Sequence, residues 1–132
     1  MFDYKYQGDP RLLPTSVLAY IGDAVFELYT RLFVIENDEG HVKGIHHKTI
    51  ALVNAKAQAG AARKIMDVLT DEELHVFKRG RNAHSHSMAK NMDPVDYQVA
   101  TGFETLIGYL YLLNRGERLK EILIQVSNSQ KI

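Results

Sequence analysis

Apolar residues recur along most of this chain at the three- and four-residue spacing of an α-helix. The first run follows Pro14-Thr15-Ser16, a typical helix start, and stops at residues 37–40, which contain Asn and Gly. Its apolar positions share one helical face: Leu18, Ile21, Val25, Leu28 and Leu32. The pattern therefore predicts a long amphipathic first helix.

Four further helices follow from the same periodicity and from local start and stop signals. We expect an alanine-rich helix over about residues 46–66, a short helix from the capping box at Thr70 and Glu73 through Phe77, a helix from Asp93-Pro94 to about Leu113, and a last helix over residues 117–126. Residues 78–92 are polar and predict a loop. No strand pattern competes with the helices, so the sequence predicts an all-α fold in a compact single domain over residues 1–132.

Length and composition limit the function classes. A chain of 132 residues with 45% hydrophobic and 24% charged residues is sized for one folded domain. Cysteine is absent, which excludes disulfides, zinc–thiolate sites and cysteine nucleophiles. Residues 1–10 do not resemble a secretion signal, and no apolar run reaches the roughly 18–20 residues that span a bilayer. We therefore expect a cytoplasmic protein without a membrane partner.

Charge is segregated although the net charge is zero. Residues 40–92 carry nine Lys and Arg against four Asp and Glu, and the rest of the chain carries the opposite excess. Such a distribution can give a neutral protein a local positive surface that attracts nucleic acid. The alternative is a set of ordinary solvated helix faces, and charge alone does not separate the two.

Two acidic residues stand in the most apolar segments. Asp23 has no charged residue within three positions on either side, and Glu104 is the only charge between Asp96 and Arg115. The segment around Glu104 is apolar nearly all round, as expected of a central helix. Small residues next to both acids, Gly22 and Gly108 among them, would let two helices approach closely.

A buried ionised carboxylate has to be paired, protonated or bound to a metal. If the two helices pack together, Asp23 and Glu104 can share a site with oxygen ligands only, which suits magnesium or manganese and not zinc. The alternative for each acid is an ion pair with a distant Lys or Arg, or a position open to water.

These segments also resemble a known family. Residues 20–28, Tyr-Ile-Gly-Asp-Ala-Val-Phe-Glu-Leu, resemble the signature of ribonuclease III, and residues 103–112, Phe-Glu-Thr-Leu-Ile-Gly-Tyr-Leu-Tyr-Leu, resemble its second block. Residues 51–54 and 78–83 match intervening segments, so the likeness covers residues 18–113 in the family's order. The chain is most similar to the Mini-ribonuclease III subgroup, which has the catalytic domain without a double-stranded-RNA-binding domain.

The resemblance implies an all-α homodimeric endoribonuclease that cleaves double-stranded RNA with Mg²⁺, for which Mn²⁺ can substitute. It implies processing of both ends of the large-subunit (23S) ribosomal RNA precursor in the bacterial cytoplasm, with a large-subunit ribosomal protein as a possible partner. Carried over by motif, Asp23 and Glu104 are the catalytic residues and the metal ligands.

The chain departs from the long family members at three acidic positions. Ser16 and Ala19 stand where those enzymes have glutamates before the signature aspartate, and Thr101 replaces an aspartate before the second-block glutamate. Glu39 resembles a further acidic position at a different spacing, and Glu27, one turn after Asp23, is either a contributor or a solvated residue.

Duplex RNA is recognised mainly through phosphates and 2′-hydroxyls. The candidates for these contacts lie in the acid-free residues 74–92 and are Lys78, Arg79, Arg81, Asn82, Ser85 and Lys90. The His46-His47 and His84-Ser85-His86 segments lack the helical spacing of metal ligands and are expected to face phosphate or solvent.

Two other functions compete with the nuclease. A catalytically silent helical RNA-binding or ribosome-assembly module would have no need for two unpaired acids. An all-α metal-dependent nucleotide hydrolase would show His-Asp or Glu-x-x-Glu ligand pairs, which this sequence lacks.

Overall fold

The computed structural model describes residues 4–37, 42–83 and 93–127. Within these ranges it has six α-helices, two short 3-10 helices and no strand, which confirms the all-α prediction. The elements are η1 (Pro10–Leu12), α1 (Thr15–Asn37), α2 (Val42–Val53), α3 (Ala55–Ile65), η2 (Met66–Val68), α4 (Asp71–Arg81), α5 (Pro94–Leu112) and α6 (Gly116–Ser127). None of these helices combines the length and the apolar character that crossing a bilayer requires.

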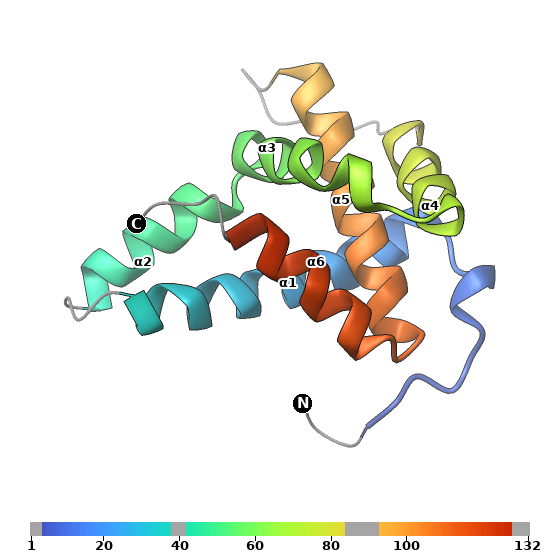
Figure 1. Cartoon of the computed structure of the whole chain (residues 1–132), viewed down its shortest axis with the longest axis horizontal. Helices are drawn as coiled ribbons and strands as arrows, with labels where there is room; N and C mark the ends of the chain where they lie inside the picture. The colour runs from blue at the N-terminus through green and yellow to red at the C-terminus, as the bar shows by residue number, and fades with distance from the viewer. Residues whose placement is uncertain (1–3, 38–41, 84–92, 128–132) are drawn as a thin grey trace.

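Helix α5 is the central element, and α1, α3, α4 and α6 all pack against it (Figure 1). Its start is fixed locally, because the Asp93 carboxylate caps it by accepting from the backbone N–H groups of Val95 and Asp96 at 2.8 and 3.1 Å. Its end is fixed by Asn114, whose φ of 60° cannot continue a right-handed helix. The core lies along its apolar residues, of which Phe103, Leu106, Ile107 and Leu110 are fully buried.

The buried side of α1 differs from the face that its sequence suggested. The residues that pack inward are Leu18, Gly22, Phe26, Thr30 and Val34, whereas Leu28 and Leu32 are exposed. The helix is apolar on more than one side, so periodicity alone did not select the inward face. An apolar surface is therefore left on the outer side of α1.

Two other element predictions were wrong in detail. The helix expected over residues 46–66 is broken into α2 and α3, because the Asn54 side chain accepts from Ala57 N at 2.9 Å and caps a new helix there. The capping box at Thr70 and Glu73 is present, but α4 continues to Arg81 and includes the first residues of the expected loop. Residues 84–92 lie outside the described part.

A buried ion pair joins α4 to α6. Glu73 is 2% exposed, and its two carboxylate oxygens accept from the Arg118 guanidinium at 2.8 Å each. The same guanidinium also donates to the Val68 carbonyl and to Glu121. This bidentate geometry offsets the cost of burying a carboxylate and fixes the outer helices around α5.

Candidate active site

The candidate site forms where α1 and α5 touch. A Cβ atom placed on Gly22 would lie 1.8 Å from the backbone oxygen of Glu104, and one placed on Gly108 would lie 1.9 Å from the backbone oxygen of Leu18. Real Cβ contacts are never that short, so only glycine allows the two backbones to meet at these points. The small residues that the sequence placed beside the two acids do bring the helices into contact.

This contact places the two carboxylates side by side. Asp23 follows Gly22 on α1, and Glu104 is the residue on α5 whose carbonyl faces Gly22. The side chains are close enough for a hydrogen bond between the carboxyl groups. Glu104 is half-buried, but Asp23 is exposed, which corrects the expectation of two buried acids. Asp23 is one position beyond the inward stripe of α1, and one position turns a helix by about 100°.

The surroundings of Glu104 favour its neutral form. Burial, the hydrogen bond with Asp23 and the charge of Asp23 together raise the pKa of Glu104 to about 8, while a hydrogen bond from the Gln58 side chain acts in the opposite direction. In the part of the chain that the structure describes, no Lys or Arg forms an ion pair with either acid. The distant ion pair considered as an alternative is therefore absent there.

The donor set fits a hard divalent cation. Two adjacent carboxylates with solvent access on one side are typical of Mg²⁺ sites, where water and substrate phosphate complete the shell. Among residues 4–37, 42–83 and 93–127 no group of three or more His, Cys, Asp or Glu could hold a metal, so the pair has no third acidic neighbour there.

The positions where the family's other acids would stand do not supply a further carboxylate. The Thr101 hydroxyl donates to the Tyr97 carbonyl at 2.9 Å, and Ser16 is exposed. The Glu27 carboxylate accepts a hydrogen bond from Arg31 at 3.0 Å in an exposed ion pair. Of the two alternatives for Glu27, a contributor to the site or a solvated residue, this is the second. Glu39 lies outside the described residues.

Three of the candidate RNA-binding residues lie on a helix end and not on the expected loop. Lys78 and Arg79 are exposed on the last turn of α4, and Arg81 donates to the Asn82 side chain at 3.1 Å. Helix α4 reaches α5 at Gly80, which packs against Thr105, the residue after Glu104. Ser85 and Lys90 fall outside the described part, as do His84 and His86.

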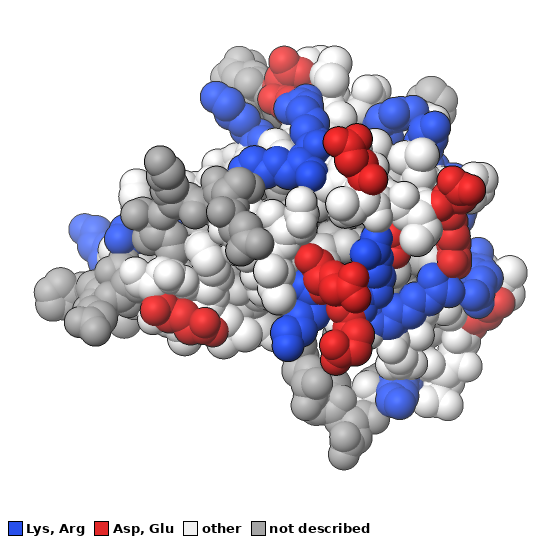
Figure 2. Space-filling model, viewed as in Figure 1, with Lys and Arg blue, Asp and Glu red and all other residues white. Residues whose placement is uncertain are grey.

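The six candidate RNA-binding residues do not include the basic residues of α3, which the sequence analysis counted only as part of the basic stretch over residues 40–92. Figure 2 shows Lys and Arg gathered over α3 and over the C-terminal end of α4, whereas positive and negative residues alternate over α6. On α3 the exposed cations are Lys56, Arg63 and Lys64, and Arg63 pairs with Asp96 at 3.0 Å. The charge excess counted along residues 40–92 is thus expressed as a basic surface on α3 and α4.

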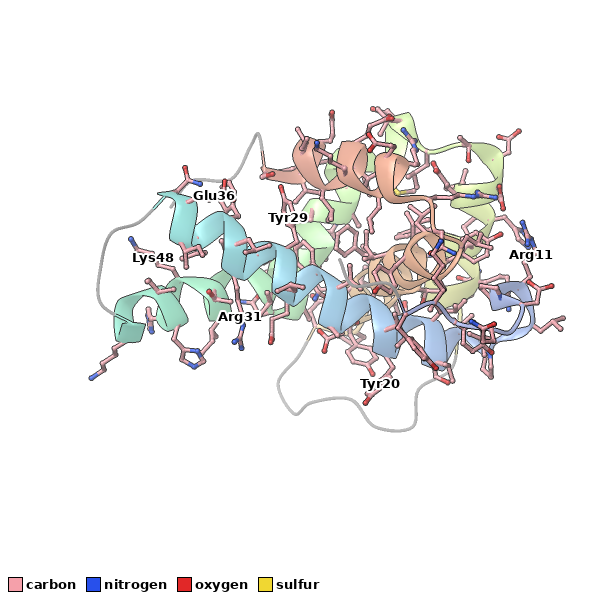
Figure 3. All side chains as sticks on the ribbon, turned by 90° about the horizontal axis from the view of Figure 1, so that it is seen from below. Arg11, Tyr20, Tyr29, Arg31, Glu36 and Lys48 are labelled. Carbon is pink, nitrogen blue, oxygen red and sulfur yellow. The ribbon has the colours of Figure 1, made fainter. Side chains whose placement is uncertain are left out.

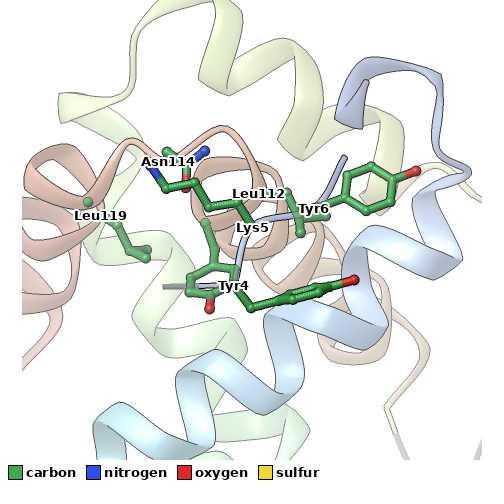
Figure 4. Close-up of a pocket in the computed structure, with 8 residues that line it drawn as sticks. Tyr4, Lys5, Tyr6, Leu112, Asn114 and Leu119 are labelled. Carbon is green, nitrogen blue, oxygen red and sulfur yellow. The ribbon is translucent and has the colours of Figure 1, made fainter. Parts of the chain in front are cut away.

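The carboxylate pair lies apart from a pocket of ≈ 180 Å³ at the C-terminal end of α5. That pocket is lined by Tyr4, Lys5 and Tyr6 of the N-terminal segment and by residues of α5, α6 and the turn between them (Figure 4). Asp23 and Glu104 instead lie where α1 contacts α5. An exposed acid at such a contact suits a large substrate better than an enclosed small molecule.

Comparison with known proteins connects this geometry to a family. The model of the Ribonuclease III domain matches residues 16–115, a segment that contains both carboxylates and most of α1 through α5. The chain belongs to the ribonuclease III family. It is an endoribonuclease of the ribonuclease III type.

Its relatives within the family are Mini-ribonuclease 3 proteins, as the motifs predicted. It is 54% identical to the Mini-ribonuclease 3 of Clostridium tetani over 121 residues, 91% of this chain and 80% of the relative. It is 43% identical to that of Symbiobacterium thermophilum, covering 88% of this chain and 89% of the relative. The crystal structure of protein FN1578 from Fusobacterium nucleatum is similar with a TM-score of 0.81 and 30% identity, over 92% of this chain and 98% of that one.

Proposed function

We propose that this ribonuclease III-type enzyme cleaves double-stranded RNA by metal-dependent hydrolysis, with Asp23 and Glu104 as catalytic residues and as ligands of Mg²⁺ or Mn²⁺. The observation that carries the proposal is the meeting of two carboxylates from α1 and α5, neither of which forms an ion pair with a Lys or Arg of residues 4–37, 42–83 or 93–127. Residues 1–132 would act as one catalytic domain.

A divalent cation bound there would activate the attacking water and neutralise charge that develops on the phosphate. The chain's own task is to present two oxygen ligands at fixed separation, and the glycine contacts between α1 and α5 do so. Glu104 has to release its proton before it can act as a ligand, since metal ligands bind deprotonated. Asp23, on the exposed side, faces the approaching RNA backbone.

The test is cleavage of duplex RNA with and without Mg²⁺ by the parent, by Asp23→Asn and by Glu104→Gln. We expect both variants to bind RNA and to lose cleavage by at least about a thousandfold, since each removes a charged ligand. Glu27→Gln is the matched control, because it neutralises a solvated acid on the same helix. A folded Asp23→Asn protein that cleaves like the parent would remove Asp23 from the site. Absence of magnesium-dependent cleavage by the parent would favour the silent RNA-binding module.

RNA would be held by the basic surface of α3 and the end of α4, where Lys and Arg side chains would contact and neutralise its phosphates. Lys78, Arg79 and Arg81 are the proposed cations on α4, with Asn82 as a neutral donor. Ser85 and Lys90 are proposed for the same task from the sequence alone.

A homodimer through the outer face of α1 is also part of the proposal. That face exposes Val17, Tyr20, Leu28, Leu32 and Ile35, with Tyr20 78% exposed. Figure 3 shows Tyr20 pointing away from the other helices. A duplex has two strands, and a two-fold pair of chains would place one carboxylate pair on each. Light scattering should give twice the 15.0 kDa chain mass, and Leu32→Glu should shift it towards the monomer. A monomeric parent at micromolar concentration would contradict this.

The proposed substrate is the precursor of the large-subunit (23S) ribosomal RNA, processed in the cytoplasm, with a large-subunit ribosomal protein as a possible partner. These assignments follow the resemblance to the Mini-ribonuclease III subgroup. They predict that cells depleted of the protein accumulate this RNA with extended 5′ and 3′ ends. Normal ends in depleted cells would refute the substrate and leave the chemistry intact.

A further inference from the structure

The pocket at the C-terminal end of α5 gathers aromatic rings around one positive charge. Three of the chain's seven tyrosines line it, Tyr4 and Tyr6 from the N-terminal segment and Tyr111 from α5. Among the described residues that line it, Lys5 is the charged one and none is acidic. Its volume of ≈ 180 Å³ is below the roughly 300–1,000 Å³ of pockets that enclose a whole small molecule. The pocket therefore matches a single ring system in size.

The two N-terminal tyrosines do not serve the hydrophobic core. Tyr4 is 77% exposed and Tyr6 is 42% exposed. Within residues 4–37, 42–83 and 93–127 neither ring stacks on another aromatic ring, and Lys5 forms no ion pair. A Cβ atom at Gly8 would lie 2.6 Å from Cζ of Tyr6, so glycine leaves room there for this ring. The rings and the ammonium group are thus available to a ligand.

The opposite wall of the pocket is fixed by the turn that follows α5. The backbone N–H of Asn114 donates to the Tyr111 carbonyl at 3.0 Å. The backbone N–H of Arg115 donates to the Leu110 carbonyl at 3.0 Å, which closes the helix end around the positive φ of Asn114. In the described part of the chain the Asn114 side chain makes no hydrogen bond, so its amide can both donate and accept. Figure 4 shows the Lys5 side chain extending towards Asn114.

The pocket and the carboxylate pair share one side of α5. Tyr111 follows Glu104 by seven residues, which is about two helical turns, so the two residues lie on the same face about 10 Å apart along the axis. At about 3.4 Å per stacked nucleotide, on the order of three nucleotides of one strand cover this distance. An RNA strand that lies over the carboxylate pair can therefore extend to the pocket.

We propose that the pocket binds an unpaired nucleobase of the RNA, where a strand continues beyond the duplex. The base stacks on the exposed tyrosine rings, its polar edge bonds the Asn114 amide, and the neighbouring phosphate pairs with Lys5. Every base has a π-face, so this contact is independent of sequence. A base inside a duplex cannot enter, because its neighbours cover both of its faces. The inference rests on the proposed function, since it assigns a further contact to the RNA that the enzyme cleaves.

The test compares a blunt duplex RNA with the same duplex carrying short single-stranded extensions. Binding is measured in EDTA, and the readout is the ratio of the two dissociation constants. The parent should bind the extended duplex roughly 5- to 150-fold more tightly, as expected for one stacked base. Replacing Tyr4 and Tyr6 together with leucine should remove most of this gain, with Tyr4→Leu alone as a second variant in case the double variant does not fold.

Phenylalanine at both tyrosine positions is the matched control. It keeps the ring faces and should retain the gain, whereas the charge added by the extensions acts equally on the leucine and phenylalanine variants. Lys5→Gln should reduce the salt dependence of binding to the extended duplex by about 0.7 in logarithmic slope, the value for one phosphate contact in a single strand.

The outcomes separate this inference from the proposed function. A parent that cleaves blunt duplex with Mg²⁺ but gains nothing from the extensions would overturn the inference alone, as would equal gains in the leucine and phenylalanine variants. Adenosine monophosphate that shifts the tyrosine ring protons in nuclear magnetic resonance, where a short single-stranded RNA does not, would assign the pocket to a free nucleotide and overturn it too. A parent that gains from the extensions but cleaves no duplex would instead overturn the proposed function.

Discussion

Replacing Glu104 with glutamine should stabilise the metal-free protein at neutral pH. The pKa of Glu104 is raised from 4.5 to about 8, so the folded state retains a proton that the unfolded chain releases. The stabilising effect of this proton is complete below pH 4.5 and is lost as the pH rises towards 8. Between these limits the unfolding free energy of the parent should fall by about 1.4 kcal/mol per pH unit relative to the variant.

The integrated effect is large for a small domain. At about pH 7 the shift corresponds to about 3 kcal/mol, with the order of magnitude set by how fully water is excluded from the carboxyl group. Glutamine is neutral at every pH and keeps the size of the side chain, so it avoids this cost. The melting temperature of Glu104→Gln should exceed that of the parent by on the order of 10 °C at neutral pH.

The assay is urea denaturation of parent and variant with EDTA, from about pH 5 to about pH 9. Glu36→Gln, at an exposed acid on α1, measures the effect of the same change on the surface. A saturating divalent cation should then stabilise the parent by about 2.7 kcal/mol at one hundred times its dissociation constant, and the glutamine variant by less. If the two proteins keep a constant difference in stability across the pH range, Glu104 is not held neutral, and the reasoning fails.

Three other changes test parts of the structure separately. Gly22→Ala should lower the unfolding free energy by about 1–3 kcal/mol and abolish cleavage, since its Cβ would lie 1.8 Å from a backbone oxygen of α5; denaturation and cleavage assays measure both, and a stable, active variant would contradict the close contact. Replacing Arg79 and Arg81 together with alanine should weaken duplex binding for all sequences and flatten its salt dependence, as measured by titration at several salt concentrations. An unchanged salt slope would place the RNA contacts elsewhere, with α3 the first region to test. Arg118→Met leaves Glu73 buried without its partner and should lower the free energy of unfolding by about 3–5 kcal/mol, as measured by urea denaturation at neutral pH. A decrease below about 1 kcal/mol would show that water or another side chain solvates the Glu73 carboxylate instead.

The elements that the sequence predicted well are those with local causes. Thr70 and Asp93 cap their helices through side chains within three residues, so their patterns are visible without tertiary information. The two acids could be paired because each stands alone in an apolar segment beside a glycine. Asn54 was overlooked because the alanine-rich segments on both sides of it favour one continuous helix.

What the sequence could not supply depends on packing between distant segments. The inward side of α1 is chosen by Gly22, which allows α5 to approach, and not by the most apolar stripe of the helix. Exposure of Asp23 follows from that choice. The effect of Gln58 on the pKa of Glu104 depends on the packing of α3 against α5, and no periodicity within α3 reveals that neighbour.

Because the two carboxylates lie on α1 and α5, which are far apart in the sequence, the site can form only late in the synthesis of the chain. Asp23 is made early in translation and Glu104 late, and the glycine contacts that align them exist only when both helices are present. A nascent or truncated chain that ends before α5 has one of the two proposed ligands and none of the core along α5. A molecule whose α1 has detached from α5 likewise has its two acids out of alignment. With the proposed pair of ligands, we expect nuclease activity only from the completed fold and none from unfinished copies.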